Sequence, residues 1–406
     1  MTAGAGPVYI TGMGAVTALG VGVAELWHGL RNGQSGVKPI VIPRTERQQI
    51  GQAAHLGSFN PADHLAPELA AATDRFVHFA LVAADEAMKR AGWASGEPMG
   101  ERTAVIIGSG IGGSATSDLG HYKFYVTRER TDPMTVPKVM PSAAASHIAM
   151  RYGARGPSFA VSSACSSSTQ AIGLGLMLIR SGMVDRAIVG GSEAMLTPAT
   201  FRAWETLRVM TPGLCRPFSK GRDGMVLGEG AAVFLLENEM SARRGAKPLA
   251  VLAGYGTSSD AMDIVRPDPG GAARSMQLAL ADANLKPRDI GYINAHGTGT
   301  ILNDASESES LRLVFDDSLP GILVSSTKPV HGHALGAAGA IELVATICAL
   351  REGLAPATIN WQEPDPRCIP DPVANTARTK DMEFAMSNSF AFGGINASLI
   401  VKRIAP

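Results

Sequence analysis

A single cysteine, Cys165, lies in the segment "VSSACSSSTQAIGLGLMLIRSG" (residues 161–182), with five serines close to it. The preceding "PSFAV" has the composition of a strand, and "SSTQAIGLGLMLIRSG" predicts a helix that ends at Gly182. Cys165 is therefore expected in a sharp turn at a helix N-terminus, where free N–H groups and the helix dipole favour a thiolate. Small neighbours would let another group approach the sulfur. The segment predicts a nucleophilic thiol; the alternative is a cysteine that only fills core space.

A nucleophilic thiol needs partners, and the nine histidines supply candidates. His296 lies in "NAHGTGT", directly after an apolar strand, and His333 lies in "SSTKPVHGHALGAAGA", between a strand and a helix rich in glycine and alanine. His331 is two residues from His333, and spacing alone does not choose between them. Lys328 is expected at the end of the preceding strand, where its ammonium could orient an imidazole or balance charge. A solvated lysine is the alternative.

Two glycine-rich loops complete the candidate chemistry. The segment "NSFAFGGINA" (residues 388–397) places a glycine pair after a strand, and such backbone N–H groups can converge into an oxyanion hole. A hairpin between "EFAMSNS" and "ASLIVKR" is an alternative that is compatible with it. The segment "IIGSGIGG" (residues 106–113) matches G-x-G-x-x-G, but no clean βαβ helix opens after it and no acidic residue follows about 20 residues later. A dinucleotide cofactor is therefore not expected.

The composition limits the setting of this chemistry. The chain has 406 residues, 45% of them hydrophobic and 18% charged, and 36 basic residues balance 36 acidic ones. The net charge is therefore close to zero, and no overall positive charge favours binding to nucleic acid or to an anionic membrane. No membrane span or targeting segment is predicted. The four cysteines form no C-x-x-C pair, which disfavours a disulfide framework or a zinc site and favours the reducing cytoplasm.

Apolar strands alternate with helical patterns, for example at residues 72–92 and 339–353, and this predicts an α/β fold with a largely buried sheet. From about Leu249 the chain repeats the order strand, helix, strand seen in its first part. We therefore predict two similar halves, residues 1–250 and 251–406, whose loops surround one shared crevice.

Four motifs in this order, "SSACSSS", "NAHGTGT", "SSTKPVHGHALGAAGA" and "NSFAFGGIN", resemble those of the β-ketoacyl-acyl-carrier-protein synthases of the thiolase superfamily. The resemblance covers essentially the whole chain. Within the family the chain is similar to the elongating, second-type synthases, and especially to the nodulation protein E-like branch through "VPKVMPSA" and "HGTGTILND". The resemblance implies a thiolase-like α/β fold in which two similar halves form α-β-α-β-α layers.

The resemblance also implies catalytic roles. Cys165 corresponds to the acyl-accepting nucleophile, and its backbone N–H forms the oxyanion hole together with that of the gating residue Phe392. His296 and His333 correspond to the catalytic histidines, and Lys328 to the lysine that supports them. His331 falls on a variable position, so the resemblance selects His333 from the pair.

Further roles follow from the same resemblance. Thr298 and Thr300 would hold the pantetheine arm, and Asp304 and Glu307 are carboxylates near the lysine with a supporting role. Ile111 would line the acyl pocket at a dimer interface. The family's basic pair for docking the acidic carrier protein falls at Arg128 and Arg130, for which a solvated charged loop is the alternative; its structural monovalent cation falls near Asn294, Glu342, Ser387 and Asn388.

The expected activity is a decarboxylative Claisen condensation of malonyl-acyl carrier protein with an acyl group on Cys165, in fatty acid or polyketide-type elongation. No metal or organic cofactor is expected in catalysis. A degradative thiolase is disfavoured because "NSFAFGGIN" lacks a second cysteine, and a non-catalytic chain-length subunit is disfavoured because Cys165, His296 and His333 are present. A homodimer is expected. The alternative is the catalytic subunit of a heterodimer with a chain-length-setting partner in specialised lipid or polyene synthesis.

Overall fold

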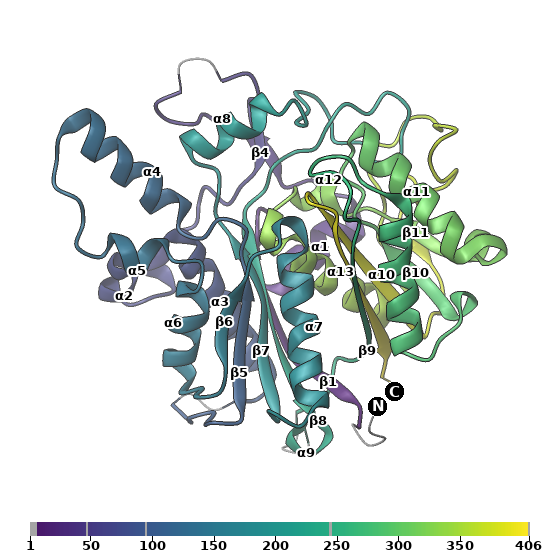
Figure 1. Ribbon diagram of the computed structural model, residues 1–406, viewed down its shortest axis with the longest axis horizontal. Helices are drawn as coiled ribbons and strands as arrows, with labels where there is room; N and C mark the ends of the chain where they lie inside the picture. The colour runs from purple at the N-terminus through teal and green to yellow at the C-terminus, as the bar shows by residue number, and fades with distance from the viewer. Residues whose placement is uncertain (1–5, 46–47, 94–95, 243–245, 405–406) are drawn as a thin grey trace.

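The structure is a computed structural model that describes residues 6–45, 48–93, 96–242 and 246–404 (Figure 1). Its main sheet contains strands from both parts of the chain. Those of the first part are β1 (Val8–Thr17), β2 (Gly20–Val21), β5 (Thr103–Gly108), β6 (Ser158–Val161), β7 (Arg186–Glu193) and β8 (Gly230–Asn238). Those of the second part are β9 (Ala250–Ser259), β10 (Ile290–Asn294), β11 (Leu323–Ser325), β14 (Phe384–Ala391) and β15 (Ile395–Arg403).

The strand order repeats. The sheet runs β11-β10-β14-β15-β9-β1-β8-β7-β5-β6, with β2 paired to β1. Without the two-residue strand β2, each half contributes five strands to this sheet. Counted along the chain, the third, second and fourth strands of each half lie side by side and are parallel. The fifth strand then pairs antiparallel with the fourth, and the first pairs antiparallel with the fifth. The halves join where β1 pairs with β9 over residues 8–10. This confirms two similar halves; the division at residue 250, where β9 begins, stays a prediction.

Helices form three layers around the two halves. In the middle, α7 (Ser167–Arg180) packs on β5 and β7, α13 (Ala338–Glu352) packs on β14, and the two helices contact each other. Outside them, α3 (Arg75–Arg90) covers β1 and β8, and α10 (Pro269–Asp282) covers β9 and β15 beside α11 (Ile301–Phe315). Residues 338–350 of α13 are all buried, which is why this helix lacks a polar face. The expected α-β-α-β-α arrangement is confirmed.

The remaining elements are short or peripheral. They are α1 (Val23–Asn32), β3 (Val37–Pro39), β4 (Gln52–Ala54), η1 (Pro61–Asp63), α2 (Pro67–Ala72), α4 (Ser114–Tyr122), η2 (Lys123–Thr127), α5 (Thr135–Val139), α6 (Ala143–Tyr152), η3 (Ala164–Ser166), α8 (Pro198–Thr206), α9 (Glu239–Ala242), η4 (Pro287–Asp289), η5 (Asp316–Gly321), α12 (Lys328–His331), η6 (Leu335–Ala337), β12 (Leu354–Ala355) and β13 (Arg378–Thr379). Among the described residues no helix has the length and apolarity that a membrane crossing requires.

Small residues let the two central helices approach the sheet and each other. A Cβ on Gly108 would overlap the backbone nitrogen of Ser168, at the start of α7, and a Cβ on Gly339 of α13 would overlap Oγ1 of Thr169. The hydroxyl of Thr169 in turn contacts Oγ of Ser389 on β14 at 2.7 Å. Close packing around the first turn of α7 therefore requires glycine at positions 108 and 339. It brings α13 and β14 of the second half close to the turn that carries Cys165.

Candidate active site

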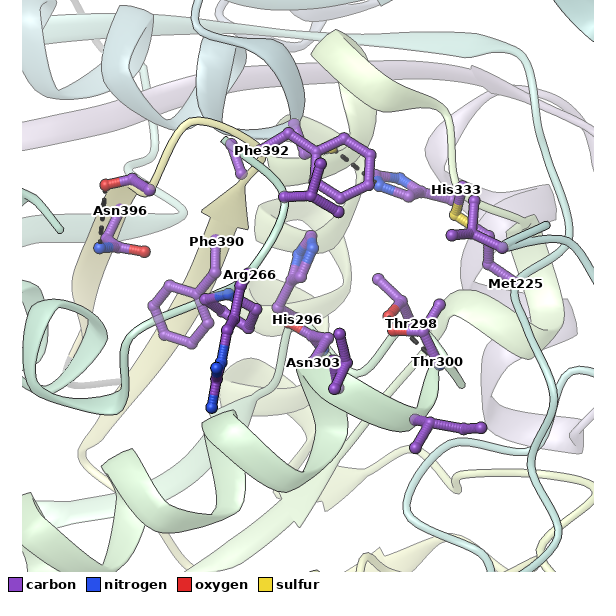
Figure 2. A pocket seen from close by; sticks show the side chains of 18 of the residues that line it. Met225, Arg266, His296, Thr298, Thr300, Asn303, His333, Phe390, Phe392 and Asn396 are labelled. Carbon is purple, nitrogen blue, oxygen red and sulfur yellow. Dashed lines mark hydrogen bonds between the residues drawn. The ribbon is translucent and has the colours of Figure 1, made fainter. Parts of the chain in front are cut away.

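Cys165 lies in η3, between β6 and α7, in the sharp turn that the sequence predicted. Ala164, the residue before it, has φ 49°, a left-handed conformation that side chains with a Cβ rarely adopt. The Cys165 side chain is buried but lines a cavity of about 240 Å³. Residues of both halves line this cavity. Figure 2 labels Met225, Arg266, His296, Thr298, Thr300, His333, Phe390 and Phe392 among them, and Trp204 and Arg208 also belong to the lining.

The structure brings both expected histidines to the cysteine. Nε2 of His333 lies 3.1 Å from Sγ of Cys165. The His296 ring lies 5.4 Å from the His333 ring, nearly perpendicular to it at 83°. The thiol sulfur and one nitrogen of each imidazole all lie within 4.8 Å of one another. One small reacting group can therefore contact all three side chains.

Lys328 fixes the protonation pattern of His296. It is the first residue of α12, three residues beyond the end of β11 rather than at the strand end that we expected. Its Nζ lies 3.4 Å from Nδ1 of His296 and is hydrogen-bonded to the carboxylate of Glu342. An ammonium offers only N–H donors, so Nδ1 of His296 must accept and the ring proton resides on Nε2. Burial, and then the positive charge of Lys328, lowers the His296 pKa well below its usual value, so the ring is neutral.

Spacing alone did not choose between His331 and His333, but the structure gives the two rings different surroundings. The His331 ring is used in structural hydrogen bonds, from Nδ1 to the carbonyl of Gly332 at 2.8 Å and between Nε2 and Oγ1 of Thr327 at 2.9 Å. It does not line the cavity. Burial also keeps His333 neutral by lowering its pKa well below the usual value, and its Nδ1 has no hydrogen-bond partner among the described residues. His333 can therefore carry its proton on either nitrogen.

The resting state of Cys165 differs from the expected thiolate. Burial raises the pKa of the thiol to about 12, although the charge of Lys328 and the backbone N–H of Phe392 both lower it. The dipole at the start of α7 acts in the expected direction, but loss of hydration outweighs it. The thiol and both imidazoles are consequently neutral, and the thiolate forms only as a proton moves to a neighbour.

Two buried carboxylates fasten the turn that carries His296. The Glu307 carboxylate accepts the backbone N–H groups of His296 at 2.8 Å and Gly297 at 2.7 Å. The Asp304 carboxylate accepts the N–H of Phe218 at 2.8 Å and that of Gly299 at 3.2 Å. These contacts hold the backbone of the histidine turn, which is a positioning role rather than direct contact with the sulfur.

The two threonines and Phe392 also reach the cavity. Oγ1 of Thr298 lies 2.9 Å from Oγ1 of Thr300, so the two hydroxyls form a polar pair on the cavity wall. The Phe392 ring stacks on Trp204 with ring centres 5.9 Å apart and planes 16° apart. Sequence reasoning missed Trp204; the available signal was one of the chain's four tryptophans in the amphipathic stretch "ATFRAWETLR".

Three residues that the resemblance selected are not brought to this cavity. Ile111 is 38% exposed and does not line it. Arg128 and Arg130 are exposed and lie beyond α4 and η2, in the segment that projects from the first half in Figure 1. Two arginines that sequence reasoning did not select, Arg208 and Arg266, do line the cavity, and their guanidinium groups have no ion-pair partner in the described part of the chain.

Glu193 is a second feature that sequence reasoning missed. It ends β7, and its buried carboxylate accepts the N–H groups of Gly110 at 2.6 Å and Gly336 at 3.1 Å. It thereby ties the loop after β5 to η6 of the other half. Burial raises its pKa to about 7. A charged residue at the end of the apolar run "RAIVGGSE" was the available signal.

Two groups of residues have donors that suit a metal ion. Cys165, His296 and His333 are of the ligand types that zinc takes, although the positive charge of Lys328 opposes a dication there. Oε2 of Glu342 and Oδ1 of Asn294 are buried oxygens without a hydrogen-bond partner among the described residues. Both are oxygen donors of the kind that a hard cation takes, and both residues are among those that the family resemblance implied for a monovalent cation.

Comparisons with protein families place the whole chain in one group. The model for the N-terminal domain of β-ketoacyl synthases matches residues 5–242, and the model for the C-terminal domain matches residues 249–362. The nodulation protein E of Rhizobium leguminosarum bv. trifolii is 42% identical over 402 residues, covering 98% of this chain and 99% of that protein. The 3-oxoacyl-[acyl-carrier-protein] synthase 2 of Staphylococcus aureus is 38% identical over 405 residues, covering 98% of both chains.

Solved structures give the same relationship. The ishigamide ketosynthase/chain length factor superposes with a TM-score of 0.93 at 32% identity, covering 99% of this chain and 100% of that one. A type II PKS acyl-carrier protein in complex with its ketosynthase bound to the hexaketide gives a TM-score of 0.90 at 31% identity, with 99% and 100% coverage. The similarity therefore extends over both halves and every element that carries a cavity residue.

Proposed function

This chain belongs to the β-ketoacyl synthase family, and from that premise we propose that Cys165 carries an acyl group and condenses it with malonyl-acyl carrier protein. The enzyme is an acyltransferase of the 3-oxoacyl-[acyl-carrier-protein] synthase type. The observation that carries the proposal is the convergence of one thiol and two neutral imidazoles on one cavity, with the His333 Nε2 at 3.1 Å from the Cys165 sulfur.

The first half-reaction transfers the acyl group. Sγ of Cys165 attacks the thioester carbonyl while Nε2 of His333 takes the thiol proton, since both groups start neutral. The tetrahedral oxyanion accepts hydrogen bonds from the backbone N–H groups of Cys165 and Phe392. The carbon–sulfur bond to the carrier breaks, and His333 returns the proton to the departing carrier thiolate. One thioester replaces another, and no proton is gained or lost.

The second half-reaction forms the carbon–carbon bond. Malonyl carrier protein loses carbon dioxide, and the electron pair of the broken carbon–carbon bond moves into an enolate. The enolate oxygen accepts hydrogen bonds from Nε2–H of His296 and from Nε2–H of His333. The enolate carbon attacks the acyl carbonyl on Cys165, and the bond to Sγ breaks to release 3-oxoacyl carrier protein. The Cys165 thiolate then takes one proton from solvent through His333, which closes the balance. Lys328 keeps the His296 donor directed toward the enolate.

Thr298 and Thr300 complete this scheme as the polar contacts for the pantetheine arm, since their paired hydroxyls lie on the wall of the cavity. Asp304 and Glu307 keep the turn between them and His296 in place. Arg208 and Arg266 line the cavity, so they are stronger candidates than Arg128 and Arg130 for contacting an acidic carrier protein there. The docking role of Arg128 and Arg130 stays a prediction.

The experiment is incubation with acyl carrier protein followed by mass spectrometry of the peptides. Acyl mass is expected on the peptide that holds Cys165, and Cys165→Ala should lose both the label and condensation while sparing some decarboxylation of malonyl carrier protein. Cys215 is the matched control, because it is also a free, buried thiol. Label on Cys215, or undiminished condensation by Cys165→Ala, would overturn the assignment.

A second subunit has a place on the first half of the molecule. The sheet ends at β6, where Phe159 is exposed. Elsewhere on this half Ile111 and the η2 residues Phe124, Tyr125 and Val126 are exposed as well. An unpaired edge beside exposed apolar side chains favours a partner. We expect a homodimer in the cytoplasm; the similarity to a ketosynthase/chain length factor favours the alternative, a heterodimer whose partner sets chain length. Ile111 would then line the acyl pocket only in the assembly. Native mass spectrometry of the enzyme, alone and co-expressed with a candidate chain-length-setting subunit, distinguishes the homodimer from the heterodimer by mass.

A further inference from the structure

The turn that carries Phe392 is held firmly on one side. It joins β14 to β15, and Gly393 and Gly394 adopt φ 84° and 66°. The N–H of Gly393 bonds to the carbonyl of Ile264 at 2.8 Å, and the N–H of Asp260 bonds to the carbonyl of Gly394 at 2.8 Å. Nδ2 of Asn396 adds a hydrogen bond to Oδ1 of Asp260 at 2.6 Å. The glycine side of the turn is therefore fixed to residues 260–264.

The Phe392 side depends on another element. Its ring stacks on Trp204 of α8, and its backbone N–H reaches Cys165. Helix α8 is a firm support, because Phe201 is buried in the core and the Glu205 carboxylate accepts the N–H groups of Gln49 and Ile50, both at 2.8 Å. Both stacked rings are half-buried and line the cavity, so the indole is a fixed surface against which the phenylalanine ring rests.

We propose that Trp204 is a specificity-determining residue for the condensation: it holds Phe392 against the entrance to Cys165 and thereby limits which acyl chains reach the sulfur. This proposal rests on the function proposed above. Phe392 lines the same cavity as Cys165, and any movement of its ring away from Trp204 gives up the stack between them. Chains that displace the ring least are accepted first. The same stack places the Phe392 N–H at the oxyanion, so selectivity and rate are linked.

The size of the effect follows from the interaction. Aromatic stacking beyond area burial corresponds to about a two- to tenfold change in an equilibrium. Trp204→Ala should therefore lower kcat for the preferred chain by about two- to tenfold, and should raise the relative kcat/KM for bulkier or longer chains by a similar factor. Trp204→Phe keeps a stacked ring and should stay within about twofold of the parent on both measures.

The test uses the full-length enzyme and a set of acyl carrier proteins of graded chain length, with Cys165 acylation and condensation followed by mass spectrometry. Leu207→Ala is the matched control, since Leu207 directly follows α8, is exposed and does not line the cavity. A double-mutant cycle with Phe392→Ala supplies a measure that a merely structural role would not move. In the Phe392→Ala background, removal of Trp204 should no longer change the chain preference.

The outcomes separate the two proposals. A parent enzyme that acylates no chain on Cys165 overturns the proposed function, and the role of Trp204 with it. A working parent whose chain preference is the same in Trp204→Ala and Leu207→Ala overturns the role of Trp204 alone, as does a Trp204 effect that persists without Phe392. Should the alanine variant fail to fold, Trp204→Leu, which keeps bulk but no ring, carries the same expectations.

Discussion

The reactivity of Cys165 toward a neutral alkylating reagent gives a sharp prediction, because a buried thiol at a helix N-terminus is subject to two opposed effects. Burial raises its pKa to about 12. At pH 7.5 this corresponds to a thiolate fraction of about 3 in 100,000, against about 1 in 10 for a free cysteine with a pKa near 8.5. The deficit is about 3,000-fold. The more basic thiolate is intrinsically about 30- to 50-fold more nucleophilic, which leaves iodoacetamide alkylation roughly a hundredfold slower than that of a free thiol.

The assay is the rate of carbamidomethylation of the Cys165 peptide, read by mass spectrometry between pH 7 and 10 with folding checked by circular dichroism. The rate should rise about tenfold per pH unit across this range, because the thiol stays protonated throughout. The same peptide in the guanidinium-unfolded chain is the control; there the rate should be about a hundredfold higher at pH 7.5 and should level off near pH 9. A plateau below pH 9 in the folded enzyme would refute the reasoning and restore the resting thiolate.

Three further predictions concern the surroundings of this thiol. His333→Ala should lose carbon dioxide release from malonyl carrier protein while still accepting some acyl groups, whereas His331→Ala should spare that release and lower Tm; the reverse pattern would mean that the wrong histidine was chosen. Glu193 has a folded pKa of about 7, above its ordinary value, so the folded parent binds the extra proton and loses stability as pH rises from about 4.5 to 7. The stability deficit of Glu193→Gln, measured by urea unfolding, should therefore shrink by up to about 3 kcal/mol between pH 5 and 8, and a constant deficit would contradict it. Because the charge of Lys328 opposes a dication at Cys165, His296 and His333, one equivalent of Zn²⁺ should leave the rate of Cys165 acylation unchanged, and inhibition at one equivalent would contradict this.

Much of the fold was predictable because its signals are local. The strand before Cys165, the helix after it and the glycine-rich hairpin around Phe392 are each written in a short stretch of sequence, and the structure contains them as β6, α7, β14 and β15. The repetition of strand order was also predictable, although only coarsely. The register that joins β1 to β9 over three residues has no local signal.

The parts of the site that escaped prediction depend on tertiary contacts. Glu193 gains its role from N–H groups that arrive from two distant loops. Trp204 is meaningful only because α8 folds back against the Phe392 turn. The Cys165 pKa was expected to be low because the helix dipole is visible in the sequence, whereas the degree of burial that reverses the effect is not. Sequence thus identifies groups that do chemistry better than groups that set their environment.

The repeated halves explain why the chemistry is divided between them. Each half turns from a strand into a central helix through a residue with positive φ, Ala164 in the first and Leu335 in the second, with φ 49° and 40°. The residue after Ala164 is Cys165, the proposed nucleophile, but the residue after Leu335 is Gly336, where a Cβ would overlap the backbone nitrogen of Gly110. The second turn is thus used for close packing against the first half, and its N–H is held by Glu193. With no cysteine in its own turn, the second half instead places both imidazoles beside the sulfur of the first. In the proposed mechanism neither half can therefore catalyse condensation without the other.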